Sequence, residues 1–152
     1  MKIAFAGHSR INSSEKLKDA VKEQIRRSIG EEPSVTCYLG GYGGFDELCA
    51  LACRELKREY ASIEIVYVSP YISLSAQAKM KDMQMRGMFD ASIYPPIENT
   101  PPRFAILKRN EWMMTNADVI IAYVTHNYGG AYKSLEVAKR KKKKIINICE
   151  FA

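Results

Sequence analysis

Short apolar runs rich in β-branched residues alternate with amphipathic segments along the whole chain. This alternation is typical of βαβ units, in which parallel strands form a sheet covered by helices on both faces. It predicts a Rossmann-like, doubly wound α/β fold with a mostly parallel sheet of about six strands. The expected strands are Ile3–Ala6, Val35–Leu39, Ile63–Val68, Ala91–Tyr94, Val119–Val124 and Ile145–Ile148.

Amphipathic periodicity and helix-end signals place five helices between these strands. The first has Ser13 or Ser14 as its N-cap and ends at Gly30. The segment from Ser75 to Met88 has the weakest helical pattern, because its methionines are only loosely spaced. The expected helical segments are residues 15–29, 45–58, 75–88, 101–116 and 130–142.

Length and charge restrict the class of protein. The 152 residues suit one domain over residues 1–152, and a basic run from Lys139 to Lys144 accounts for the whole net charge of +6. The apolar run Val119–Val124 is far shorter than the roughly 20 residues of a membrane-spanning helix, and the N-terminal apolar segment is too short for a signal peptide. We therefore expect a cytoplasmic protein with no membrane partner.

The cysteines and histidines do not form a metal-binding pattern. Cys37, Cys49, Cys53 and Cys149 contain no Cys-x-x-Cys pair, so we expect neither disulfides nor zinc. We expect no bound metal and no resident cofactor.

Three unusual loops follow predicted strands, at the edge of the sheet where such folds bind ligands. They are residues 7–10, residues 40–44 and residues 127–130. Glycines in such loops either make tight turns or let the backbone and a helix N-terminus approach a phosphate, and three loops together favour binding. Neither a complete G-x-G-x-x-G motif nor a P-loop is present, which argues against hydride transfer and ATP hydrolysis.

Several side chains near these loops could contact a ligand. Asp46 and Glu47 either stabilise the start of a helix or hold ribose hydroxyls, whereas Arg10 and Arg109 offer planar forks to phosphate oxygens. The candidate ligand-binding residues are Gly7, His8, Ser9, Arg10, Gly40, Gly41, Tyr42, Gly43, Gly44, Asp46, Arg109, Asn110, His126, Tyr128, Gly129 and Gly130. The two histidines are either ordinary loop residues or a general base and a ligand donor.

Four stretches of the chain resemble the SLOG superfamily. They are Ala6-Gly7-His8, Leu39–Asp46, Arg109–Ala122 and Tyr128-Gly129-Gly130, and they span nearly the whole sequence. The superfamily has a Rossmann-like fold and includes small stand-alone proteins, the DNA-processing protein of transformation and the Lonely Guy phosphoribohydrolases. The resemblance implies a nucleotide or nucleotide-derived ligand, and because relatives often dimerise we expect a homodimer.

The resemblance to Lonely Guy enzymes is incomplete. Arg109, Met113, Ala117 and Asp118 match an enzyme motif that precedes a strand, but the glycine loop after that strand lacks the enzyme's proline. The resemblance implies that Arg109 acts with a carboxylate on an N-glycosidic bond, and Glu47 and Glu136 are the candidates for that carboxylate.

The sequence thus predicts binding of an adenine nucleotide or an ADP-ribose-like ligand, with an N-glycosidase as the alternative. Single-stranded nucleic acid is a second alternative, but the basic run lies at a helix C-terminus and lacks interleaved aromatics, so we do not expect nucleic acid as a partner. We expect Gly43→Val and Arg109→Ala to abolish ligand binding and leave the fold intact.

Overall fold

A parallel six-stranded sheet in the order β4-β3-β2-β1-β5-β6 organises the computed structural model, which describes residues 1–150. The predicted domain extends to Ala152, and its last two residues lie outside this range. The predicted doubly wound fold is confirmed, with every strand pair parallel. The strands are β1 (Lys2–Gly7), β2 (Val35–Leu39), β3 (Ile63–Val68), β4 (Ala91–Ile93), β5 (Val119–Tyr123) and β6 (Lys144–Asn147).

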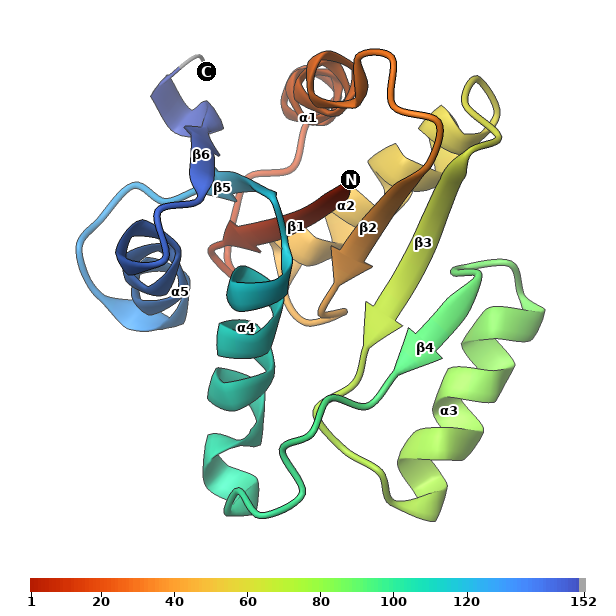
Figure 1. Ribbon diagram of the computed structural model, residues 1–152, viewed down its shortest axis with the longest axis vertical. Coiled ribbons are helices and arrows are strands. Elements are labelled where there is room, and N and C mark those ends of the chain that lie inside the picture. Colours follow the sequence, from red (N-terminus) through yellow and green to blue (C-terminus); the bar gives the residue numbers. More distant parts are fainter. Residues whose placement is uncertain (151–152) are drawn as a thin grey trace.

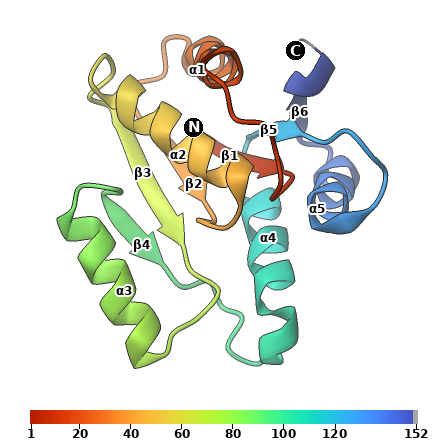
Figure 2. The same ribbon diagram turned by 180° about the vertical axis from the view of Figure 1, so that it is seen from behind.

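Helices cover both faces of this sheet. α2 lies over the sheet in the view from behind (Figure 2), and α4 lies on the opposite face (Figure 1). The helices are α1 (Glu15–Ile29), α2 (Gly44–Lys57), α3 (Leu74–Met85), α4 (Ala105–Asn116) and α5 (Gly129–Arg140). Short 3-10 segments at Pro102–Phe104 and Ile148–Glu150 complete the described elements.

The side-chain alternation of β1 divides the core between the two faces. Ile3 and Phe5 pack in one buried cluster with side chains of α1 and α2. Ala4 and Ala6 pack in another with side chains of α4 and α5. Because both faces of β1 are buried, the sequence of this central strand is a continuous apolar run, as expected for a parallel sheet.

The helix-end signals of the first helix are confirmed. The Ser14 hydroxyl accepts a hydrogen bond from the Leu17 amide at 3.0 Å, and Gly30 ends α1 with a φ of 52°. Other ends differ from the prediction by a few residues. The helix expected to reach Met88 ends at Met85, because a turn containing Gly87 at a φ of 76° follows it. Likewise, α5 ends at Arg140 rather than Lys142, which adopts a left-handed conformation.

The topology creates a switch point at β1. Strands β2, β3 and β4 extend the sheet on one side of β1, and β5 and β6 extend it on the other. The loops after β1 and β5 therefore lead to helices on opposite faces, and a crevice opens between them at the carboxyl ends of the strands.

Among residues 1–150, no helix is long and apolar enough to cross a membrane. All four cysteines are free, and three of them are buried. The three buried cysteines pack as small apolar side chains.

Candidate functional site

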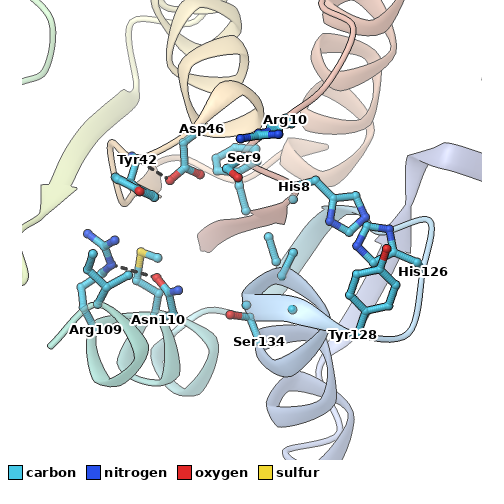
Figure 3. A pocket seen from close by; sticks show the side chains of 18 residues that line it. His8, Ser9, Arg10, Tyr42, Asp46, Arg109, Asn110, His126, Tyr128 and Ser134 are labelled. Atoms are coloured by element: carbon cyan, nitrogen blue, oxygen red, sulfur yellow. Dashed lines mark hydrogen bonds between the residues drawn. The ribbon is translucent and has the colours of Figure 1, made fainter. Parts of the chain in front are cut away.

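A cavity of about 580 Å³ lies at this switch point (Figure 3). It is lined by the β1–α1 loop, the start of α2, one face of α4 and the first turn of α5. Its size falls within the range of about 300–1,000 Å³ that is typical of small-molecule sites. The crevice expected at the carboxyl ends of the strands is thus present.

Most of the sequence-predicted residues lie around this cavity. Those that line it are Gly7, His8, Ser9, Arg10, Tyr42, Asp46, Arg109, Asn110, His126, Tyr128, Gly129 and Gly130. The other glycines of the second loop do not line it, and they are Gly40, Gly41, Gly43 and Gly44.

The β1–α1 loop closes the N-terminus of α2. The Gly44 amide donates to the Ser9 carbonyl at 2.7 Å, and the Phe45 amide donates to the His8 carbonyl at 3.3 Å. A Cβ atom at Gly43 would lie 2.7 Å from Ser9 Cα, so this glycine permits close packing of two loops. The first amides of α2 are therefore used within the protein, and the expectation that the second glycine loop presents them to a phosphate is corrected.

The N-terminus of α5 is open by contrast. Tyr128 occupies its N-cap position and makes no side-chain capping hydrogen bond. Gly129 and Gly130 are exposed, and no other segment within residues 1–150 comes within 4 Å of a Cβ built at either of them. The first turn of α5 thus brings unpaired amides and the positive end of a helix dipole to the cavity.

Arg109 is a buried cation in the wall of the cavity, with only 1% of its surface exposed. Its Nη1 donates to the carbonyls of Gly40 at 2.7 Å and Val68 at 2.8 Å, and its Nε donates to Asn110 Oδ1 at 2.9 Å. No buried side-chain nitrogen or oxygen in residues 1–150 lacks a partner. Nη2 makes no hydrogen bond within that part of the chain, and the Arg109 side chain lines the cavity.

Asp46 is the carboxylate of the cavity. Burial raises the pKa of Asp46 to about 6, although the Tyr42 amide, which donates to Oδ2 at 3.2 Å, and the charge of Arg109 favour the ionised form. Burial in turn lowers the pKa of Arg109, and Asp46 opposes that effect. A carboxyl group with a pKa near neutrality can either accept hydrogen bonds from hydroxyls or exchange a proton.

A column of aromatic rings stands at the other side of the cavity. His8 stacks on His126 with ring centroids 3.9 Å apart, and His126 stacks on Tyr128 at 4.0 Å. The Thr125 amide donates to His8 Nε2 at 2.9 Å, which places the proton of neutral His8 on Nδ1. Burial and the neighbouring His126 lower the pKa of His8. His8 is therefore better suited to a structural contact than to the role of general base.

The structure does not bring Glu47 or Glu136 to the cavity. Glu47 and Lys18 line a separate surface depression, and Glu136 lines another depression between α4 and α5, where it pairs with Lys139 at 3.3 Å. Successive helix positions point about 100° apart, so Asp46 faces the cavity and its neighbour Glu47 does not. The basic run begins at the opposite end of α5 and does not line the cavity either.

Several lining residues were missed by the sequence analysis. They are Phe5, Ala6, Ile106, Met113, Ala131 and Ser134. Two of them could have been predicted from helical spacing. Ile106 and Met113 lie three and four residues from Arg109, on the same face of α4. No group of three or more His, Cys, Asp or Glu side chains within the described residues is placed to hold a metal ion.

Solved structures with a similar fold include two DNA processing proteins and a cofactor carrier. The DNA processing protein A of Helicobacter pylori matches with a TM-score of 0.60 and 18% identity over 95% of this chain and 63% of its own. That of Streptococcus pneumoniae matches with a TM-score of 0.61 and 18% identity over 95% of this chain and 48% of its own. The molybdenum cofactor carrier protein of Chlamydomonas reinhardtii matches with a TM-score of 0.56 and 15% identity over 95% and 73%.

The chain has a Rossmann-like fold that it shares with these three structures. The resemblance seen in the sequence is confirmed at this level, and this chain spans about three fifths and one half of the two DNA processing proteins. No family model and no curated protein matches the sequence.

The comparisons correct one expectation about partners. We did not expect nucleic acid as a partner, and this expectation is wrong, because the similar DNA processing protein A of Helicobacter pylori binds single-stranded DNA. The position of a basic run at a helix end was too weak a reason to dismiss nucleic acid. The homodimer expected from the sequence stays a prediction.

Proposed function

We propose that this protein binds a nucleotide-type ligand, an adenine nucleotide or an ADP-ribose-like molecule, in the cavity at the switch point. The observation that carries the proposal is the open first turn of α5, where Gly129 and Gly130 line the cavity without a side-chain cap. A helix N-terminus of this kind favours an anion, and the cavity beside it has the volume of a ligand site.

Arginine side chains support an anionic ligand. Arg10 is exposed, lines the cavity and is free to turn toward a phosphate with its planar fork. Arg109 has a different role, because Nη1 and Nε are already bound to protein acceptors, whereas Nη2 has no acceptor within residues 1–150. Arg109 is thus suited to one fixed hydrogen bond with the ligand and a static positive charge.

Asp46 and Arg109 together suit the hydroxyls of a sugar. A Cβ atom at Gly40 would lie 3.0 Å from both Asp46 Oδ2 and Arg109 Cζ, so the glycine lets an acceptor and a donor pack closely, and both of these side chains line the cavity. A ribose hydroxyl both donates and accepts, and it would satisfy the two groups together.

Equilibrium dialysis against AMP, ADP-ribose, NAD and cyclic nucleotides, with chromatography of both chambers, tests this proposal. We expect at least one nucleotide to concentrate on the protein side. We expect its binding to weaken when Arg10 is replaced by alanine. Equal concentrations of every nucleotide in both chambers would refute nucleotide binding.

Hydrolysis of an N-glycosidic bond is a second candidate, favoured by the pKa of about 6 for Asp46. In this reaction water adds to the anomeric carbon, the bond to the base breaks, and the base leaves with a proton. Asp46 would move a proton or stabilise the positive charge that develops on the sugar, the role that the sequence suggested for Glu47 or Glu136. Free base in the dialysis chambers, absent with Asp46→Asn, would support hydrolysis; intact ligand would dismiss it.

A further inference from the structure

The two ends of the cavity differ in chemistry. Figure 3 shows Asp46, Tyr42 and Arg109 on one side and the His8, His126 and Tyr128 rings on the other, with Ser134 of α5 between them. One end therefore offers charge and hydrogen bonds, and the other offers aromatic surface. A ligand that matches both ends needs a hydroxyl-bearing group and a planar ring joined by a linker.

The aromatic end is anchored in the core of the protein. Phe45, which is fully buried, stacks on Tyr123 with ring centroids 5.9 Å apart, and Tyr123 meets His8 edge to face at 6.4 Å. His8 and His126 then stack nearly parallel, with an interplanar angle of 7°. Each ring packs on the next, so Tyr128 is supported by a column of rings that begins in the core.

Tyr128 ends this column at the surface. It is 67% exposed, although one face of its ring packs on His126 at an interplanar angle of 27°. It is also the residue immediately before the open first turn of α5. A supported aromatic ring with a free face, next to an anion site, is the arrangement that stacks a nucleobase at low entropic cost.

We infer that Tyr128 is a stacking site for the nucleobase of a two-ended ligand of the nucleoside diphosphate sugar class. The base stacks on the free face of Tyr128, the diphosphate lies at the N-terminus of α5, and the second sugar reaches Asp46 and Arg109. This inference rests on the proposed function and adds to it the class of ligand and its direction in the cavity.

Calorimetric titration with ADP-ribose tests the stacking site in Tyr128→Leu, Tyr128→Phe and a matched control. The control is Tyr42→Leu, because Tyr42 is 66% exposed and lines the opposite end of the same cavity. We expect Tyr128→Leu to weaken ADP-ribose binding by about 5- to 150-fold, the range of base–aromatic stacking, and Tyr128→Phe to bind within about twofold of the natural protein. We expect Tyr42→Leu to have a smaller effect than Tyr128→Leu.

Pyrophosphate, which has no base, serves as the second probe in competition with ADP-ribose. Its affinity should be the same in Tyr128→Leu as in the natural protein. The stacking site is refuted if Tyr128→Leu leaves the affinity for ADP-ribose unchanged, or if it lowers the affinity for pyrophosphate by the same factor. In either case nucleotide binding itself stands. If the natural protein binds neither ADP-ribose nor any other nucleotide tested, the proposed function fails and the stacking site fails with it.

Discussion

Asp46 Oδ2 and the guanidinium carbon of Arg109 each lie 3.0 Å from the position that a Cβ atom would take at Gly40. The two side chains therefore approach the same glycine, and both line one cavity. Their positions come from different parts of the fold, since Asp46 begins α2 and Arg109 lies in the middle of α4.

Asp46 should make the stability of the protein depend on pH. The folded state raises the pKa of this carboxyl from 3.8 to about 6, so the folded protein holds the proton more tightly than the unfolded chain does. The free energy of unfolding should therefore fall as the pH rises from about 4 through 6, and stay level above that range.

Asp46→Asn should remove this dependence, because the amide oxygen can still accept from the Tyr42 amide and carries no charge. Urea unfolding of both proteins at several pH values measures the effect. The free energy of unfolding of the variant, measured relative to that of the natural protein, should rise by about 1–3 kcal/mol between pH 4 and pH 7. A difference that does not change with pH would contradict the raised pKa.

Arg109→Ala should destabilise the fold itself, contrary to the expectation drawn from the sequence. The substitution leaves the carbonyls of Gly40 and Val68 without their donor and opens a void, which together cost about 2–5 kcal/mol. Arg10→Ala is the matched control, since Arg10 lines the same cavity but is exposed, and its cost should stay within about 0.5 kcal/mol. Chemical denaturation measures both, and equal stability of the two variants would contradict the structural role of Arg109.

Gly43 should tolerate substitution less well than Gly30, although both have positive φ angles, of 92° and 52°. An alanine at either position is strained, but only at Gly43 does the new Cβ meet another segment, 2.7 Å from Ser9 Cα. We expect Gly43→Ala to cost about 1–3 kcal/mol more than Gly30→Ala in thermal or urea unfolding. Gly43→Val, which the sequence suggested as a neutral probe of binding, should be more destabilising still. Equal costs for the two alanine variants would show that the loops do not pack this closely.

The sequence was sufficient for the fold because its local signals agree with the topology. The bounds of β2 and β3 match the apolar runs Val35–Leu39 and Ile63–Val68 without a shift, since both strands are buried on both faces. The ends of α3 and α5 were less accurate, because turns that contain Gly87 and Lys142 decide them.

The candidate site was only partly predictable. The loops after β1 and β5 follow from topology, but the closure of α2 by the Ser9 and His8 carbonyls depends on a loop conformation that no local pattern encodes. The choice between Asp46 and Glu47 was also open, because the sequence does not say which side of a helix faces a cavity made by other elements. The positions of Ile106 and Met113 in the cavity wall could not be predicted, because they depend on how α4 packs against the sheet.

The most direct test of nucleotide binding is a comparison of Gly130→Glu with Gly130→Gln by calorimetric titration of ADP-ribose and AMP. A side chain at this position meets open space, and a carboxylate at a helix N-terminus does not harm the helix, so both variants should fold. If the phosphate binds at the first turn of α5, the glutamate should repel it and weaken binding by at least about tenfold relative to the glutamine of the same shape. Equal affinities of the two variants for a nucleotide that the natural protein binds would contradict a phosphate site at this turn.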